Sequence, residues 1–172
     1  MTDSLLPPEL VRLATRVVEE NRAAGRRIAV AESCTGGLVA AALTEVPGAS
    51  DVFEAGYVTY GDEAKTALLG VSPDVIQTFG AVSLATGWAM ANGAVARSGV
   101  DVAVAVTGIA GPGGGSERKP VGTVVFARAR AGEEPDDALT DHRLFENNGR
   151  AAIRLQAALC ALELLLPDAA AP

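Results

Sequence analysis

The run Val102-Ala103-Val104-Ala105-Val106 contains only apolar residues, with no polar residue alternating between them. Valine favours strands, and a strand that is apolar at every position is buried on both of its faces. Such strands belong to sheets that carry helices on both sides. This run therefore constrains the chain to an α/β fold.

The rest of the chain alternates helical patterns with short apolar strands. Apolar residues recur at three and four positions between Leu10 and Val18, which predicts a helix that ends at Gly25. We predict further strands at 28–31, 52–60, 121–127 and 143–145, and helices at 38–44, around Lys65, from Pro73, from Ser83 and over about 151–166. The short link between the last two strands requires an antiparallel pair. The expected fold is a single domain, 1–172, forming a three-layer α/β/α sandwich with a mixed, mostly parallel sheet of about five strands.

Charge and composition limit the partners and the compartment. Lys and Arg number 14 against 21 Asp and Glu, a net charge of −7, so direct nucleic-acid binding is not expected. The longest uncharged stretch, 75–96, is interrupted by polar residues and by glycines, so no membrane span is expected. Two cysteines are too few for a disulfide framework, and no leader segment is apparent. We therefore expect a cytoplasmic protein.

The predicted final helix is apolar nearly all round, apart from Arg154, Gln156 and Glu163. One side of such a helix packs on the core, and the other side can pack on another subunit. We expect a homo-oligomer, with a dimer favoured.

The segment from Ser33 to Gly37 leaves a buried strand and enters a helix, at the sheet edge where α/β folds bind ligands. Ser33 is a candidate nucleophile there. Free N–H groups at the helix start, near Thr35 and Gly36, are candidate donors to an oxyanion. Ser33 or Thr35 can instead merely cap the helix. Cys34 is a rival nucleophile, because a helix start lowers the pKa of a thiol.

A serine nucleophile needs a base, and the only histidine, His142, lies beside an acidic loop, where we expect it to face solvent. Tyr60 and Lys65 are five positions apart across a strand end and a helix start, so both can face one crevice. Burial and the helix dipole would lower the pKa of the lysine. The alternative is a solvated lysine paired with Asp62 or Glu63.

Other polar segments suggest anion binding. The loop 108–116 is rich in glycine, but it lacks Gly-Lys-Ser/Thr and is followed by a strand, which excludes a P-loop and a Rossmann fingerprint. With Arg118 and Lys119 it remains a candidate cradle for phosphate or sugar, or a loop without a ligand. Arg150 and Arg154 share a helix face and can clamp an anion or pair with acids. No spacing of His and Cys suggests a metal site.

Five blocks make this sequence resemble the CinA carboxy-terminal domain family, whose stand-alone members include bacterial nicotinamide-mononucleotide amidases. The blocks occur in family order over roughly residues 10–165; they are Ala31-Glu32-Ser33-Cys34-Thr35-Gly36-Gly37, Val58-Thr59-Tyr60 with Glu63-Ala64-Lys65, Gly80-Ala81-Val82-Ser83, Thr107-Gly108-Ile109-Ala110-Gly111-Pro112, and Lys119-Pro120-Val121-Gly122-Thr123-Val124.

The resemblance implies hydrolysis of the carboxamide of nicotinamide mononucleotide to nicotinate mononucleotide and ammonia, in pyridine nucleotide recycling, without a metal or organic cofactor. It also implies that Ser33 is the nucleophile, that Lys65 is its base and that Tyr60 relays a proton or orients a group. Residues expected to bind the substrate are Thr35, Gly36, Gly37, Thr107, Gly108, Gly111, Gly113 and Arg150.

The sequence departs from the family pattern at two places. The family often has Ser-Asn where this chain has Gly61-Asp62, and Gly-Asp-Arg where it has Asn148-Gly149-Arg150. Many members carry a larger amino-terminal domain, whereas we expect this chain to be the stand-alone form or an excised piece. The association of the family with competence and DNA damage leaves a second hypothesis, a noncatalytic nucleotide-binding or interaction module.

Overall fold

A computed structural model of the chain describes residues 4–134 and 137–167, which contain one five-stranded sheet of order β2-β1-β3-β4-β5. The strands are β1 (Ile28–Glu32), β2 (Phe53–Val58), β3 (Val102–Gly108), β4 (Thr123–Arg130) and β5 (Leu139–Leu144). β1 pairs in parallel with β2 and β3, whereas β4 is antiparallel to both β3 and β5. Only β4 among these strands runs in the opposite direction. The prediction of a mixed, mostly parallel sheet is confirmed.

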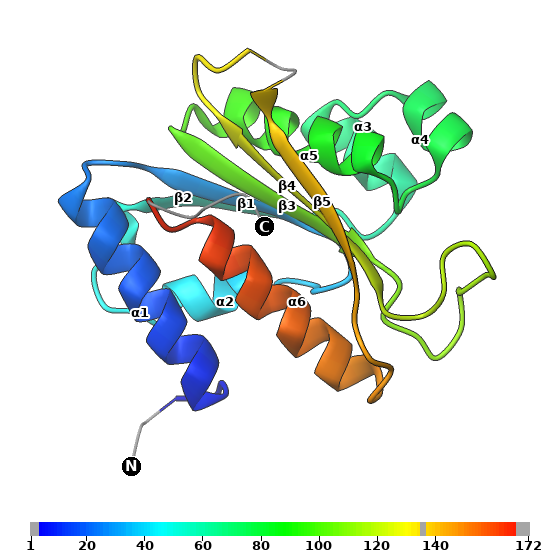
Figure 1. The fold of residues 1–172 in the computed structure, drawn as a ribbon. Coiled ribbons are helices and arrows are strands. Elements are labelled where there is room, and N and C mark those ends of the chain that lie inside the picture. The colour runs from blue at the N-terminus through cyan, green and yellow to red at the C-terminus, as the bar shows by residue number, and fades with distance from the viewer. Residues whose placement is uncertain (1–3, 135–136, 168–172) are drawn as a thin grey trace.

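Helices cover both faces of this sheet (Figure 1). On one face lie α1 (Pro8–Ala23), α2 (Leu38–Thr44) and α6 (Arg150–Leu164), and on the other lie α3 (Asp62–Leu69), α4 (Pro73–Phe79) and α5 (Leu84–Ser98). Successive strand residues point to opposite faces, so Val104 joins the core under α1, α2 and α6 while Ala105 joins the core under α5. The predicted three-layer sandwich is confirmed.

Small residues bring α5 close to the sheet. The strands present mainly alanine to this helix, and a Cβ on Gly87 would lie 2.9 Å from Val125 Cγ1. Ser83 caps α5 as predicted, because its hydroxyl accepts a hydrogen bond from Thr86 N at 3.1 Å. The loop that precedes α5 is thereby held near the carboxyl end of β3.

The bounds of β2, β4 and β5 differ from the prediction by two residues or more. β2 ends at Val58 rather than at residue 60, because Lys65 Nζ takes the carbonyl oxygens of Thr59 and Tyr60. β4 starts two residues later and runs on to Arg130, paired with β3 along its length. β5 begins at Leu139 rather than 143, since its polar residues lie on an edge strand that is open to solvent.

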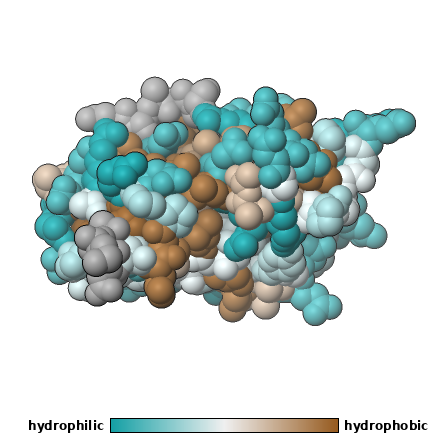
Figure 2. Space-filling model, turned by 90° about the horizontal axis from the view of Figure 1, so that it is seen from below, coloured by the Kyte–Doolittle hydropathy of each residue, from teal (hydrophilic) through white to brown (hydrophobic). Residues whose placement is uncertain are grey.

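Packing against the core of the same chain accounts for most of the apolar residues of α6. Six of its residues are buried, and Leu155 and Leu159 pack partly buried against the same core as α1 and α2. From below the sheet, Figure 2 shows brown apolar atoms still reaching the surface among teal polar ones. A second subunit on this side stays a prediction. Among the described residues no helix is long and apolar enough to cross a membrane.

Candidate active site

Ser33 lies directly after β1, at the sheet edge where β1 and β3 end. Its backbone N–H donates to Val106 O at 2.9 Å, which fixes the residue to the neighbouring strand, and it is only 7% exposed. The chain then turns through Gly36 and Gly37, whose φ angles of 61° and 93° favour glycine. This turn sends the chain into α2 and leaves Ser33 at the strand end.

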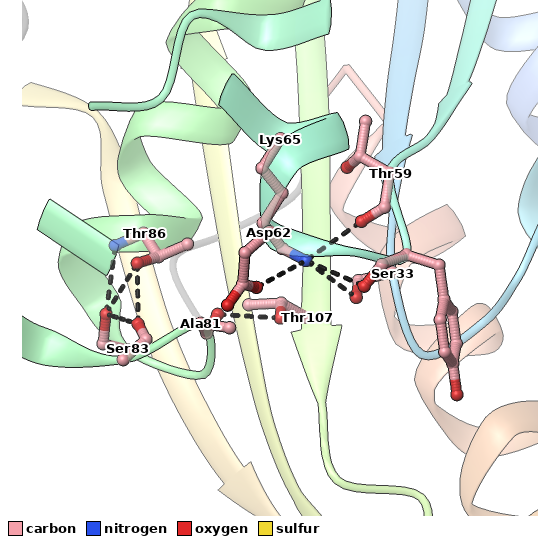
Figure 3. Close-up of polar contacts among 10 residues, drawn as sticks. Ser33, Thr59, Asp62, Lys65, Ala81, Ser83, Thr86 and Thr107 are labelled. Atoms are coloured by element: carbon pink, nitrogen blue, oxygen red, sulfur yellow. Dashed lines mark hydrogen bonds and ion pairs between the residues drawn. The ribbon is translucent and has the colours of Figure 1, made fainter. Parts of the chain in front are cut away.

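Lys65 extends from α3 toward Ser33 and is almost completely buried, with 1% exposure. Its Nζ lies 3.4 Å from Ser33 Oγ, 3.0 Å from Thr59 O and 3.2 Å from Tyr60 O (Figure 3). A neutral amine has two N–H bonds and one lone pair, and a carbonyl oxygen can only accept. When both N–H groups are donated to the carbonyls, the lone pair is left for the Ser33 hydroxyl proton.

Two features of the surroundings of Lys65 shift its pKa in opposite directions. Burial lowers the pKa of Lys65, and the Asp62 carboxylate, 3.8 Å from Nζ, raises it; burial prevails. The Asp62 side chain is 59% exposed, so solvent weakens this ion pair. The expectation of a lysine with a lowered pKa is therefore confirmed, and the solvated alternative is wrong, although Asp62 does contact the amine.

A cavity of about 200 Å³ opens in front of these two residues. It brings together six of the residues predicted to be catalytic or to bind substrate, and the rival nucleophile Cys34 and three apolar residues complete the lining. The predicted ones are Ser33, Tyr60, Lys65, Thr107, Gly108 and Arg150, and the others are Cys34, Ala81, Val82 and Ala110.

Thr35, Gly36 and Gly37 do not line the cavity, and most of their polar groups are satisfied internally. Thr35 Oγ1 donates to Glu32 Oε2 at 2.6 Å, Gly36 N to Ser33 O at 3.0 Å and Gly37 N to Glu32 Oε2 at 3.1 Å. The expectation of free N–H groups at the start of α2 is wrong for the glycines. Within the described chain, the N–H groups of Cys34 and Thr35 donate to no oxygen, and both interact with the Cys34 sulfur.

Arg150, at the start of α6, closes one side of the cavity. Its Nη2 donates to the Tyr60 hydroxyl at 3.0 Å and its Nη1 to Gly111 O at 2.7 Å. Gly111 therefore contacts Arg150 but does not itself line the cavity. The exposed Gly113 does not line the cavity either. Arg154 does not join Arg150 in an anion clamp, because it donates to the carbonyls of Cys34 and Thr35.

The opposite wall is the loop 80–83, which is held by hydroxyl groups (Figure 3). Thr107 Oγ1, at the end of β3, donates to Ala81 O at 2.9 Å. Ser83 and Thr86 both donate to Gly80 O, at 2.9 and 2.8 Å. The sequence shows the helix cap at Ser83, but the packing of this loop against Thr107 depends on the tertiary fold.

Two other residues, a candidate nucleophile and a candidate base, are poorly suited to these roles in the structure. Burial is the main cause that raises the pKa of Cys34 to about 12, so its thiol is protonated at neutral pH. His142 is exposed on β5, as expected, and lines a different groove of about 540 Å³ together with Arg118 and Lys119. The proposed cradle of Arg118 and Lys119 therefore lies outside the Ser33 cavity. In residues 4–134 and 137–167, no His, Cys, Asp or Glu side chains form a group of three that could hold a metal ion.

In this α/β sandwich a serine at the strand edge contacts a buried lysine inside a cavity, and comparison with known sequences gives the family. The profile of the CinA C-terminal domain matches residues 10–168, so the chain belongs to this family. It is 45% identical over 165 residues to the nicotinamide-nucleotide amidohydrolase PncC of Escherichia coli K12, covering 96% of this chain and 95% of that protein.

Other relatives are longer than this chain. A CinA-like protein of Akkermansia muciniphila is 62% identical over 108 residues, and one of Mycobacterium avium is 53% identical over 143 residues. The matches cover 63% and 83% of this chain, but only 26% and 33% of those proteins. The chain thus corresponds to a part of these relatives and to nearly the whole of the E. coli protein.

Crystal structures of relatives share the fold. The competence/damage inducible protein CihA of Agrobacterium tumefaciens has a TM-score of 0.89 and 46% identity, covering 94% of this chain and 96% of that one. A CinA superfamily protein of Klebsiella pneumoniae has a TM-score of 0.84 and 36% identity, covering 91% and 94%.

Proposed function

We propose that this protein is an amidase that hydrolyses the carboxamide of nicotinamide mononucleotide to nicotinate mononucleotide and ammonia, in pyridine nucleotide recycling. The observation that carries the proposal is the 3.4 Å contact between Ser33 Oγ and the buried Lys65 Nζ in a cavity. The similarity to the E. coli amidohydrolase over 96% of the chain supplies the substrate.

The first half of the reaction uses Ser33 and Lys65. Ser33 Oγ attacks the carboxamide carbon while neutral Lys65 Nζ takes its proton. The N–H group of Cys34, which lines the cavity, and that of the adjacent Thr35 have no oxygen acceptor within the described chain, and they stabilise the oxyanion of the tetrahedral intermediate. The C–N bond then breaks, Lys65 returns the proton to the leaving nitrogen, and ammonia departs from an acyl-serine.

The second half repeats these steps with water. Lys65 takes a proton from the attacking water, a second tetrahedral intermediate forms, and its collapse returns the proton to Ser33 Oγ. The acid released in this step gives up its own proton to solvent and leaves as the carboxylate of nicotinate mononucleotide. Two carbonyl oxygens hold the amine in place for both halves, so the same lone pair serves each time.

The dimensions and charges of the site fit this substrate. About 200 Å³ is below the ~300–1,000 Å³ of pockets that enclose a drug-sized ligand, so the cavity takes the pyridine carboxamide and the ribose phosphate lies at its mouth. Arg150 lies on the lining and supplies a guanidinium for the phosphate. Tyr60, whose hydroxyl accepts from Arg150, orients that guanidinium.

A noncatalytic binding module accounts poorly for Lys65. Burying an amine is costly, and binding alone does not need the amine beside a hydroxyl. The reducing cytoplasm is the proposed place of action, in keeping with the free thiols of Cys34 and Cys160. The test incubates purified protein with nicotinamide mononucleotide and follows ammonia; tight binding by calorimetry with no turnover would favour the binding module instead.

A further inference from the structure

Two charged side chains lie behind the nucleophile loop, which comprises residues 33–37, and neither lines the cavity. Glu32, the last residue of β1, is completely buried, and Arg154 reaches the loop from α6. Both are satisfied by groups of the loop and of the start of α2. Arg154 is only partly buried, but burying a charge as fully as that of Glu32 rarely improves stability over an apolar residue of similar size, so its presence here needs another reason.

Glu32 binds donors of the loop and of the start of α2. Its Oε2 accepts from Thr35 Oγ1 at 2.6 Å and from the N–H groups of Gly37 and Val39, each at 3.1 Å. Its Oε1 accepts from Ala40 N at 2.8 Å. The carboxylate thus occupies the donors at the start of α2 and fixes the Thr35 side chain away from the cavity.

Arg154 binds the acceptors of the same loop. Its Nε donates to Cys34 O at 3.2 Å and its Nη2 to Thr35 O at 2.8 Å. In a trans peptide the C=O of one residue and the N–H of the next point in opposite directions. A guanidinium on Cys34 O therefore directs the N–H of Thr35 away from Arg154.

A hydrogen bond within the loop fixes the peptide between Ser33 and Cys34. Gly36 N donates to Ser33 O at 3.0 Å, and the trans peptide between Ser33 and Cys34 then sets the direction of the Cys34 N–H. Among the described residues of this loop, only the N–H groups of Cys34 and Thr35 have no oxygen acceptor; their partner is the Cys34 sulfur, which accepts only weakly. The two charged side chains thus hold the loop in a conformation in which no strong acceptor occupies these donors.

We propose that Glu32 and Arg154 are positioning residues, which hold the N–H groups of Cys34 and Thr35 in place for the oxyanion by binding the opposite polar groups of the loop. This inference rests on the proposed amidase function. It predicts that loosening the clamp weakens binding of the transition state and leaves binding of the ground-state amide unchanged.

The main test is Arg154→Lys, which keeps the charge and the stem but cannot donate to both carbonyls as a planar fork. With nicotinamide mononucleotide we expect kcat to fall about 10- to 100-fold, somewhat less than the ~10²–10³ typical of deleting an oxyanion donor outright. KM should change less than about twofold. Arg143→Lys is the matched control, because Arg143 contacts Cys160 of the same helix and does not line the cavity; its kcat should equal that of the wild type.

A second readout separates positioning from a general loss of structure. Pyridine-3-boronic acid forms a tetrahedral adduct with a serine and so imitates the intermediate. Its inhibition constant should rise in Arg154→Lys by the same factor as kcat falls, while the melting temperature stays within a few degrees of the wild type. Glu32→Gln should show the same pattern if it folds, and Arg154→Lys decides the question if it does not.

The outcomes separate the two levels of the proposal. A wild-type protein without turnover rejects the amidase function and this inference with it. An active wild type with unchanged kcat in Arg154→Lys, or a loss of kcat matched by the Arg143→Lys control, rejects the positioning role and leaves the amidase function in place.

Discussion

Lys65 Nζ lies 3.4 Å from Ser33 Oγ, although the two residues are separated by 32 positions and stand on different elements of the fold. Ser33 follows β1, and Lys65 belongs to α3, which follows the neighbouring strand β2. Parallel pairing of β1 and β2 brings their carboxyl ends together, so the contact follows directly from the sheet topology.

Removing either partner of this contact should abolish turnover. We expect Ser33→Ala and Lys65→Met to lower kcat at least about a thousandfold, because one loses the nucleophile and the other the base. Ammonia release from nicotinamide mononucleotide measures the loss, and circular dichroism checks the fold. Substantial activity in either variant would rule out the Ser/Lys mechanism.

Lys65→Met should also change the pH dependence of stability. The folded-state pKa of Lys65 lies below its ordinary 10.5, so the unfolded chain binds more protons between these values and wild-type stability rises with pH across that interval. We expect thermal unfolding at graded pH to show that this rise is missing in Lys65→Met. An identical rise in both proteins would mean that Lys65 carries its ordinary pKa in the fold.

Asp62 should set the pH at which the enzyme becomes active. Lys65 must be neutral to act as a base, and the Asp62 carboxylate, 3.8 Å away, raises its pKa against the effect of burial. Asp62→Asn removes this charge, so the acidic midpoint of kcat/KM should move to lower pH. The shift should shrink at high salt, because Asp62 is exposed.

Glu63→Gln is the matched control for this charge change. Glu63 is adjacent in sequence, but it lines a separate groove between α3 and α4 rather than the Ser33 cavity. A profile that moves equally in Glu63→Gln would indicate a general field effect, and one that moves in neither variant would contradict the role of Asp62.

Arg150 should determine recognition of the phosphate. We expect Arg150→Gln to raise KM for nicotinamide mononucleotide at least about tenfold, since a charge-assisted contact is lost, with little effect on nicotinamide riboside, which lacks the phosphate. Steady-state kinetics with both substrates measures this selectivity. An equal loss for both would show that Arg150 does not bind the phosphate.

Tyr60→Phe distinguishes two roles for the hydroxyl that accepts from Arg150. An orienting role predicts a smaller rise of KM than in Arg150→Gln, with kcat nearly unchanged. A fall of kcat alone would identify Tyr60 as a proton relay instead. Kinetics of the double variant with Arg150→Gln should be no worse than that of Arg150→Gln alone if the two residues act through one contact.

Cys34 should be dispensable for the chemistry. Its pKa of about 12 keeps the thiol protonated and unreactive, so Cys34→Ala should retain at least about a third of wild-type activity. Iodoacetamide at neutral pH should leave the wild-type enzyme active. Loss of activity in Cys34→Ala with activity kept in Ser33→Ala would select a cysteine hydrolase.

A dimer is expected from the apolar surface that remains beside α6. One chain has a mass of 17.4 kDa, and sedimentation at micromolar concentration should give twice that mass. A single-chain mass under these conditions would contradict the expectation.

Local patterns in the sequence predict the layers of the fold and the candidate reactive groups. The apolar run at 102–106 requires a buried strand, the helical spacing of apolar residues predicts its covering helices, and Ser33, Tyr60 and Lys65 mark the candidate chemistry, because these are local patterns. The predicted strand ends were less accurate where a distant side chain binds the backbone, as Lys65 binds the carbonyls of Thr59 and Tyr60.

The partners of the polar groups around Ser33 are set by distant segments that meet in the folded chain. The sequence favours Gly36 and Gly37 as donors, but Glu32 and Ser33 O take their N–H groups, and Arg154 from α6 turns toward the loop instead of toward an anion. Burial likewise argues against Cys34 as the nucleophile, because it raises the pKa of the thiol. The partner of a backbone donor, the burial of a thiol and the lowered pKa of an amine depend on residues far apart in the chain, and no local pattern encodes them.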